Sequence, residues 1–567
     1  MNTADSEKSG LTANGYNRQW WKEAVVYQVY PRSFKDSNGD GVGDLNGITA
    51  QLDYLQELGI DVLWLSPHYD SPNVDNGYDI RDYRKVMAEF GTMADFDLLL
   101  QGVKQRNMKM ILDLVVNHTS DEHVWFAASR ASQTGPYSDY YIWRSNKEGR
   151  EPNNWQSFFS GSAWKKDPVR GEYYLHLFAE KQPDLNWENP KVRSEVHDLM
   201  RFWLDKGIDG FRMDVIPFIS KDQTFSDYGA EEASRPEYFF AAGPKLHDYL
   251  QEMNREVLSK YDLMTVGEAF GVTLAQTPLL VDERRHELDM ILHFDAVRLN
   301  RQGWKWIPWR LPDLKAIYAR FERELDAHSW NTVFLSNHDN PRPVSNFGDD
   351  SPAYRVASAK VLATMLLTLK GTPFIYQGDE LGMTNYPFKR IEEFDDIEVK
   401  NAWRAQVLTN QVEAQDYLWH MRKTSRDHSR TPMQWDDSPN GGFTTAPKPW
   451  FAVNPNYREI NARQALADPR SIYHYFKQLI ALRRNHLAFV YGDYADLDPQ
   501  HPSLYIYTRA LAEEKFLVTL NFSTNKIEYA LPDGLKTTEL MLGNLGSKEE
   551  HTSTIRLEPW EANIYRL

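Results

Sequence analysis

The sequence predicts an α/β fold: a (β/α)8 TIM barrel with a small domain inserted after the third strand and a C-terminal antiparallel β-sandwich. Eight short apolar runs alternate with amphipathic stretches, as in a parallel sheet covered by helices. A long polar and aromatic excursion follows the third run, and strictly alternating apolar positions appear near the C-terminus. The eight runs are 24–31, 61–67, 109–117, 210–215, 263–268, 288–295, 332–339 and 372–380.

The order of these runs sets the expected domain boundaries. Amphipathic segments at 48–59 and 93–107 are the helices expected between the first three strands. A connection as long as the excursion after the third run predicts a domain of its own. The expected parts are a polar N-terminal tail (1–19), the barrel (20–117 and 186–490, with a charged helical insertion at about 381–445), domain B (118–185) and the C-terminal β domain (491–567).

Composition and charge exclude several classes of protein. The net charge of -16 argues against a nucleic-acid partner, which would require basic patches. No apolar run reaches about 18 residues, so no membrane partner is expected. The absence of cysteine excludes disulfides and thiolate catalysis. The N-terminus lacks the apolar core of a signal peptide, which predicts a cytoplasmic location; a periplasmic location stays open if the chain is a processed form. The chain is expected to be a monomer.

Charged side chains gather where the predicted strands end. Asp214 ends the fourth strand, Glu268 the fifth and Asp339 the seventh. The C-terminal ends of strands hold the active site in enzymes of this fold. Because a buried carboxylate is costly unless it is paired, packing alone does not explain three of them at one rim. The sequence therefore predicts a catalytic site there, with an ion-pair network as the structural alternative.

Arg212 and Asp214 stand two positions apart in the run "GFRMDV" and point to the same side of a strand. We expect the guanidinium to hold Asp214 ionised as a nucleophile. Glu268 would instead stay protonated as the general acid, and Asp339 would stabilise positive charge and bind sugar hydroxyls. Two carboxyl groups with separated pKa values are what glycoside cleavage requires.

Four stretches then identify a family. "DLVVNH" (113–118), "GFRMDV" (210–215), "VGEAF" (266–270) and "FLSNHD" (334–339) resemble the conserved regions of the α-amylase superfamily, glycoside hydrolase family 13. "DNGYDI", "GTPFIYQGDELGMTN" and "RTPMQWD" are similar to its oligo-1,6-glucosidase, isomaltulose hydrolase and sucrose isomerase branch. The resemblance extends from about Trp20 to the C-terminus and implies a small α-glucoside substrate.

The resemblance implies a role for each catalytic residue and for the floor of the sugar pocket. Asp214 matches the nucleophile, Glu268 the acid/base and Asp339 the carboxylate that stabilises the transition state. The residues that match contacts to the sugar in the -1 subsite are His118, Arg212 and His338.

The resemblance also implies how the pocket is closed. Asp75 and Tyr78 match a pair at the non-reducing end of the sugar. Arg430 matches an arginine that pairs with Asp75 or holds the terminal hydroxyls, which bidentate hydrogen bonds can read. The positions that match the pocket wall are Phe159, Phe178 and Gln182, with ordinary packing of domain B as the alternative.

A loop after the first strand offers five oxygen donors at alternate positions, with glycine at the sixth. Glycine also occupies the twelfth position, where an EF-hand has glutamate, so a calcium sensor is excluded. The donors are the side chains of Asp36, Asn38, Asp40 and Asp44 and the carbonyl of Val42. The resemblance implies a structural Ca²⁺ in this loop. Mg²⁺ and a solvated Asp/Gly turn are the alternatives.

The residue after the nucleophile, Val215, accompanies α-1,6 preference in relatives. Sucrose isomerases of the branch carry an "RLDRD"-like segment, whereas this chain has "RLNRQ" at 298–302, with Asn300 and Gln302 in place of two acids. Arg298 and Arg301 of this segment would bind the sugar in the +1 subsite or belong to a solvated loop.

These features predict a retaining, exo-acting α-glucosidase. It would hydrolyse α-1,6 bonds of isomaltose, isomaltulose or short isomalto-oligosaccharides by double displacement. A sucrose isomerase that forms isomaltulose or trehalulose is the main alternative, and a non-catalytic binding protein on the same fold is a further one.

Overall fold

The computed structural model describes residues 10–145, 150–546 and 551–567. Its centre is a sheet of eight parallel strands in the order β11-β10-β9-β5-β2-β1-β15-β14. Thr332 Oγ1 donates a hydrogen bond of 2.7 Å to the carbonyl of Ile291, so the two edge strands meet and the sheet nearly closes into a barrel. The strands are β1 (Val26–Val29), β2 (Val62–Leu65), β5 (Lys109–Val115), β9 (Gly210–Asp214), β10 (Met264–Glu268), β11 (Met290–Leu292), β14 (Thr332–Val333) and β15 (Thr372–Tyr376). All eight predicted strands, and with them the (β/α)8 barrel, are confirmed.

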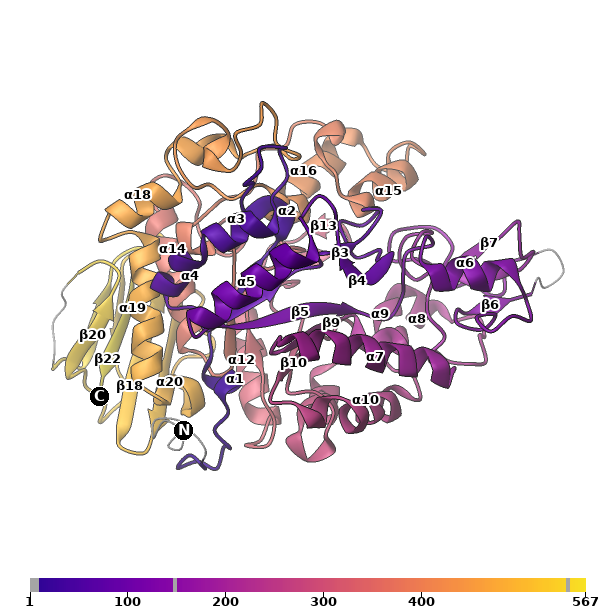
Figure 1. Ribbon diagram of the computed structural model, residues 1–567. Coiled ribbons are helices and arrows are strands. Elements are labelled where there is room, and N and C mark those ends of the chain that lie inside the picture. Colours follow the sequence, from indigo (N-terminus) through magenta and orange to yellow (C-terminus); the bar gives the residue numbers. More distant parts are fainter. Residues whose placement is uncertain (1–9, 146–149, 547–550) are drawn as a thin grey trace.

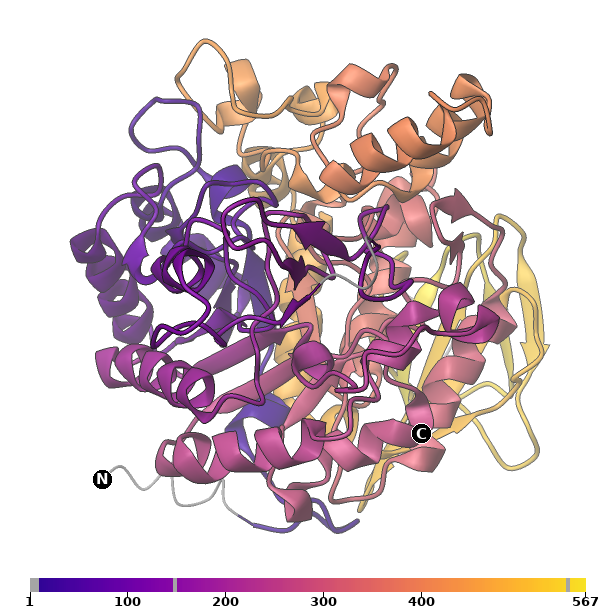
Figure 2. The same cartoon turned by 90° about the vertical axis from the view of Figure 1, so that its right-hand side faces the viewer.

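Helices surround the strands on the outside (Figure 2). α5 (Met93–Gln105) shows why they form: Thr92 and Asp95 make a capping box at its start, and apolar side chains at helical spacing face the barrel. The other covering helices include α4 (Leu52–Leu58), α7 (Pro190–Lys206), α10 (Leu246–Glu256), α12 (Leu311–Glu324), α14 (Arg355–Thr368) and α19 (Ile472–Asn485). Within the described ranges, every helix is too short or too polar to span a bilayer.

Domain B lies between β5 and β9 and projects from the end of the barrel opposite the C-terminal sheet (Figure 1). It holds the antiparallel strands β6 (Trp143–Arg144), β8 (Tyr173–Leu175) and β7 (Trp164–Lys166), with α6 (Val124–Ala131) beside them. β-bridges join His118 to Asp184 and Tyr141 to Leu185. These bridges fix the base of domain B to the end of β5. A separate hairpin, β3 (Tyr69–Asp70) and β4 (Asp82–Val86), carries the loop that contains Asp75.

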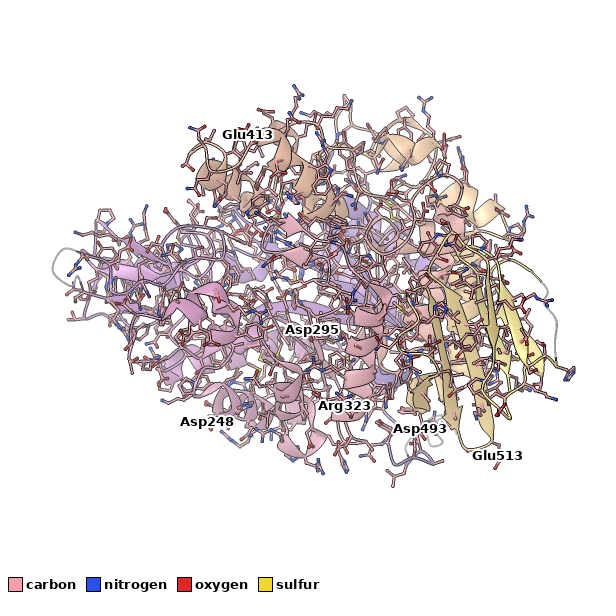
Figure 3. The ribbon with its side chains drawn as sticks, turned by 180° about the vertical axis from the view of Figure 1, so that it is seen from behind. Asp248, Asp295, Arg323, Glu413, Asp493 and Glu513 are labelled. Carbon is pink, nitrogen blue, oxygen red and sulfur yellow. The ribbon has the colours of Figure 1, made fainter. Side chains whose placement is uncertain are left out.

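The insertion after β15 carries α15 (Ile397–Gln406), α16 (Ala414–Thr424) and α17 (Asp427–Arg430). It has an apolar core of its own, with Phe388, Phe394 and Tyr417 at the centre. Glu413, the residue before α16, lies on its outer face (Figure 3). The insertion therefore forms a compact unit that stands beside domain B above the strand ends.

The C-terminal part is an antiparallel β-sandwich, as predicted. One sheet has the order β16-β17-β18-β22-β20, and β19 pairs with β21. Apolar side chains of both sheets, such as Leu517 and Ile555, share one core. The strands are β16 (Asp493–Asp496), β17 (Leu504–Leu511), β18 (Glu514–Asn521), β19 (Ile527–Ala530), β20 (Glu539–Gly543), β21 (Thr554–Leu557) and β22 (Ala562–Arg566). Asp493 and Glu513 mark one end of the larger sheet (Figure 3).

The N-terminal segment differs from the loose tail that its polarity predicts. Residues 1–9 lie outside the described residues, but residues 10–19 pack against the barrel. Tyr16 is buried and accepts a hydrogen bond of 2.9 Å from Lys370, and Asn17 donates one of 2.6 Å to Glu283. One buried aromatic side chain and polar contacts together hold this segment against the barrel.

Candidate active site

A cavity of about 340 Å³ opens at the C-terminal ends of the barrel strands. Asp214, Glu268 and Asp339 all line it, although they come from β9, β10 and the loop after β14. The other predicted residues that line it are Asp75, Tyr78, His118, Phe159, Phe178, Arg298 and Arg301. Four further predicted residues are almost completely buried and contact the lining residues from behind: Arg212, Gln182, His338 and Arg430.

One guanidinium joins three carboxylates at the bottom of this cavity. Arg212 Nη1 contacts Asp113 and lies 2.7 Å from Asp214 Oδ1, while its Nη2 lies 2.8 Å from Glu268 Oε2. The arrangement follows from the sheet, because β9 lies between β5 and β10 with Arg212 opposite Asp113. We call these four residues the floor cluster. Bridging by one planar group places Asp214 and Glu268 beside the same point of the cavity.

The charges of the floor cluster do not balance. Burial raises the pKa of Asp214 well above its usual value; Arg212 opposes the rise, and the carboxylates of Glu268 and Asp113 add to it. Burial likewise raises the pKa of Asp113 to about 6, against the effect of Arg212. Burial and Arg212 therefore shift the pKa of Asp214 in opposite directions, and the ionisation of Asp214 by Arg212 stays a prediction. A single positive charge is shared among three acids, so it compensates the charge of each acid only in part.

Val215, directly after the nucleophile, has an unusual backbone. Its φ of 33° and ψ of 38° lie in the left-handed region, which is strained by about 1–3 kcal/mol for a β-branched residue. In this conformation its N–H donates a hydrogen bond of 3.0 Å to Glu268 Oε2. Oε2 therefore accepts from both Val215 and Arg212, which leaves Oε1 as the oxygen that can carry a proton.

A second group of charges, the wall cluster, consists of Asp75, Asp339, Asp396, Arg426 and Arg430. Arg430 Nη2 donates a hydrogen bond of 2.9 Å to Asp339 Oδ1, and Arg426 Nη1 lies 3.5 Å from the same oxygen. Arg426 also contacts Asp396 through two nitrogens and lies 3.7 Å from Asp75. Among the described residues Arg426, not Arg430, is the ion-pair partner of Asp75. The other role implied for Arg430, holding the terminal hydroxyls of the sugar, stays a prediction.

Two arginines outweigh burial at Asp339. Burial acts to raise its pKa, but His338, Arg426 and Arg430 together hold it well below its usual range. Burial lowers the pKa of His338 to about 3, so this imidazole is neutral near pH 7 and the two arginines carry the effect there. Asp339 thus presents a fixed negative charge to the cavity.

The remaining sugar-site residues form a connected layer around the cavity. Gln182 Nε2 donates a hydrogen bond of 3.2 Å to Asp75 Oδ2, and it lies 3.3 Å from His118 Nε2. The rings of Tyr78 and His338 are stacked, with centroids 5.1 Å apart. Among the described residues, the buried hydroxyl of Tyr78 has no hydrogen-bond partner.

Arg298 and Arg301 stand at the mouth of the cavity. The Arg298 guanidinium lies 4.3 Å from the centre of the Phe270 ring, and burial lowers its pKa to about 10. Arg301 forms an ion pair of 2.6 Å with Glu398, so its charge is already compensated. Between them, the Asn300 amide is buried and bonds to Asn346.

Several lining residues are absent from the sequence prediction. Arg426 is the residue before α17 and stands four positions before Arg430, close enough in sequence to have been considered with it. The mouth residues come from loops whose sequence carries no period. The missed lining residues include Phe158, Glu237, Phe270, Phe294, Glu398 and Arg426.

The predicted metal loop follows α2 (Pro31–Phe34), a single helical turn after β1. Gly41, at the sixth position of the loop, has a φ of 95°, and its N–H donates a hydrogen bond of 2.8 Å to Asp36 Oδ2. The all-oxygen donor set suits Ca²⁺. Within the described ranges, however, histidine, aspartate and glutamate side chains form no group of three or more that could hold an ion. A metal in this loop would therefore also need the Asn38 side chain and the Val42 carbonyl as ligands. The calcium site stays a prediction.

Comparison with known proteins gives a consistent result. The model of the family described as "Alpha amylase, catalytic domain" matches residues 28–492. The oligo-1,6-glucosidase of Parageobacillus thermoglucosidasius is 55% identical over 97% of this chain and 99% of its own length. The oligo-1,6-glucosidase of Bacillus cereus is 51% identical over 97% and 100%. The crystal structure of the trehalulose synthase from Pseudomonas mesoacidophila matches with a TM-score of 0.96 and 51% identity, over 97% of this chain and 100% of that one.

Proposed function

The chain belongs to the alpha-amylase family, and we propose that it is a retaining, exo-acting α-glucosidase that hydrolyses α-1,6-glucosidic bonds. Its substrates would be isomaltose, isomaltulose or short isomalto-oligosaccharides. The observation that carries this proposal is the floor cluster, in which one guanidinium contacts both Asp214 and Glu268. Two carboxyl groups beside one anomeric centre are the requirement of double displacement.

In the first step Asp214 forms a bond to the anomeric carbon while the bond to the leaving oxygen breaks. The leaving oxygen takes the proton of Glu268 Oε1, the oxygen that neither Val215 nor Arg212 occupies. Water then loses a proton to Glu268 and attacks the same carbon, which releases α-glucose and restores Asp214. Asp339, kept negative by Arg426 and Arg430, stabilises the positive charge that develops on the sugar ring.

Exo action follows from the closed end of the cavity. Asp75 and Arg426 provide charged groups beside the rings of Phe159 and Phe178. Charged hydrogen bonds to the hydroxyls of a terminal glucose would fix its orientation, and the rings would cover its apolar face. A chain that continued beyond this glucose would collide with that wall.

The α-1,6 preference is supported by the named relatives, which are oligo-1,6-glucosidases at 51% and 55% identity. Sucrose isomerisation is the second candidate, because a trehalulose synthase is similar in structure over the whole chain. The mouth favours hydrolysis. In place of two acids this chain has Asn300, which is buried against Asn346, and Gln302, which is exposed.

A kinetic panel of isomaltose, isomaltulose, maltose, panose, trehalulose and sucrose tests the proposal. We expect glucose from isomaltose, glucose plus fructose from isomaltulose, and slow turnover of maltose. Accumulation of isomaltulose or trehalulose from sucrose would assign the isomerase instead. Lack of turnover of every α-glucoside would favour a binding protein.

We also propose that the loop 36–44 holds a structural Ca²⁺, with Mg²⁺ as the alternative. Asp36, Asn38, Asp40, Val42 and Asp44 would supply the oxygen ligands. Such an ion lies outside the cavity and would stabilise the loop rather than take part in the reaction. A monomeric state and a cytoplasmic location stay predictions.

A further inference from the structure

Behind the wall of the active-site cavity lies a second, more open cavity of about 1100 Å³, which we call the outer groove. It runs between domain B and α15. Its lining mixes charged and apolar groups and includes Lys165, His176, Glu180, Lys181, Ile397 and Arg404. Phe159 and Phe178 line both cavities, so these two rings are the partition between them.

The two rings are held very differently. Phe178 packs into the aromatic core of domain B, with ring contacts to Phe158, Phe218 and His118. Within the described part of the chain, the ring contact of Phe159 is with Phe178 alone, at 5.6 Å. Phe159 therefore has fewer ring contacts than Phe178, although it is the more buried of the two.

Phe159 is instead positioned by polar contacts. Asn401 Nδ2, on α15, donates a hydrogen bond of 3.0 Å to the Phe159 carbonyl. Arg404 Nη1 donates a hydrogen bond of 3.0 Å to Asn401 Oδ1 and so fixes the orientation of the Asn401 amide. On the cavity side, the Phe159 ring lies 5.1 Å from the guanidinium carbon of Arg426. The insertion therefore holds Phe159 from outside the pocket.

We propose that Phe159, positioned by Asn401, makes the enzyme exo-acting by separating the glucose pocket from the outer groove. The groove has the volume and the mixed lining to hold a further glucosyl unit attached at the non-reducing end. Opening the partition would join the two cavities and allow cleavage inside an α-glucan chain. This inference rests on the proposed α-glucosidase function.

The test uses a p-nitrophenyl α-maltoside whose terminal 4- and 6-hydroxyls are blocked by an ethylidene group. Release of ethylidene-maltose from it requires the inner glucose in the pocket and the blocked glucose beyond Phe159. We expect the wild type to release almost none. Asn401→Asp, which loses the donor to Phe159 but keeps the acceptor for Arg404, should raise this release about fivefold.

A larger opening and a matched control complete the design. Phe159→Ala should raise release of ethylidene-maltose about 100-fold relative to the wild type. Lys400→Ala removes an exposed ion pair with Asp395 next to Asn401 on α15 and should change nothing. Folding of each variant is checked by its melting temperature. If folded Asn401→Asp and Phe159→Ala both exclude the blocked substrate, the partition has no such role.

Calorimetric titration with ethylidene-maltose separates this inference from the proposed function. Binding that is stronger in Phe159→Ala than in the wild type supports the partition even if the wild type cleaves no α-1,6 bond. Normal cleavage of isomaltose with unchanged exclusion of ethylidene-maltose in both variants keeps the function and overturns the partition.

Discussion

The floor cluster and the wall cluster are built from the same kinds of charged residue, but the pKa values of Asp214 and Asp339 are shifted in opposite directions. In the floor cluster, Arg212 is the single guanidinium that contacts three carboxylates, and burial raises the pKa of Asp214. In the wall cluster, Arg426 and Arg430 both serve Asp339, whose pKa is held low although it is also buried. Two arginines therefore outweigh burial at Asp339, whereas one does not at Asp214. Burial also raises the pKa of Asp75 in the wall cluster, against the effect of Arg426 and Arg430.

This difference matches two different tasks. An acid that must gain and lose a covalent bond needs a charge that is not fully compensated, since a strongly stabilised carboxylate is a poor nucleophile. An acid that only stabilises charge performs best when it is permanently ionised and held in place. Asp214 and Asp339 meet these two requirements within one cavity.

The largest effect is expected from Asp214→Asn, which removes the nucleophile while Arg212 remains. Initial rates on isomaltose should fall about 10⁴-fold or more, because no covalent intermediate can form. Calorimetric binding of glucose should persist, since the wall cluster is untouched. A variant that kept a tenth of wild-type turnover would place the nucleophile elsewhere.

Arg430→Gln tests the wall cluster. Asp339 would lose one of two arginines, so kcat/KM should fall about 100-fold. The low pKa of Asp339 contributes stability above its unfolded value, about 4, and this contribution is lost as the pH falls below that value. The melting temperature of the variant should therefore lie below that of the wild type at pH 7, and the gap should narrow below about pH 4. A gap that widens in acid would contradict the assignment.

Asp113→Asn tests the floor cluster in the opposite direction. Asp113 raises the pKa of Asp214, so its neutralisation should lower that pKa and move the acid limb of kcat/KM to lower pH. Activity at the optimum should fall about tenfold or less, because Asp113 is completely buried and lies outside the cavity lining. Trp64→Phe is the control, since it removes the hydrogen bond of 2.7 Å to Asp113 without changing charge. An upward shift of the acid limb in Asp113→Asn would show that Asp113 acts mainly by holding Arg212.

The two clusters also differ in how far the sequence predicts them. The floor cluster stands on strands, where a period of two and parallel pairing place Arg212, Asp214 and Glu268 at one rim. The wall cluster is assembled from loops and the insertion, so Arg426 was missed, and the ion pair with Asp75, one of the two roles implied for Arg430, is made by Arg426 instead. The sequence also does not reveal how many acids share Arg212, and this number bears on the pKa of Asp214.

The smallest effect is expected from removal of calcium. The loop 36–44 contacts the insertion, which carries part of the wall cluster, so loss of the ion should affect the wall cluster and leave the floor cluster unchanged. Asp36 accepts a hydrogen bond from the Thr444 hydroxyl, and the backbone N–H of Trp450 donates a hydrogen bond of 2.8 Å to the Gly41 carbonyl. Removing an ion from this loop with a chelator should lower the melting temperature by roughly 3 °C. It should raise KM through the insertion and its wall cluster, yet leave the acid limb set by Asp214 in place.

Asp40→Asn should reproduce the effect without chelator, and added Ca²⁺ should reverse only the chelator effect. A chelated protein with unchanged melting temperature and KM would show that the loop is a solvated turn stabilised by its own hydrogen bonds.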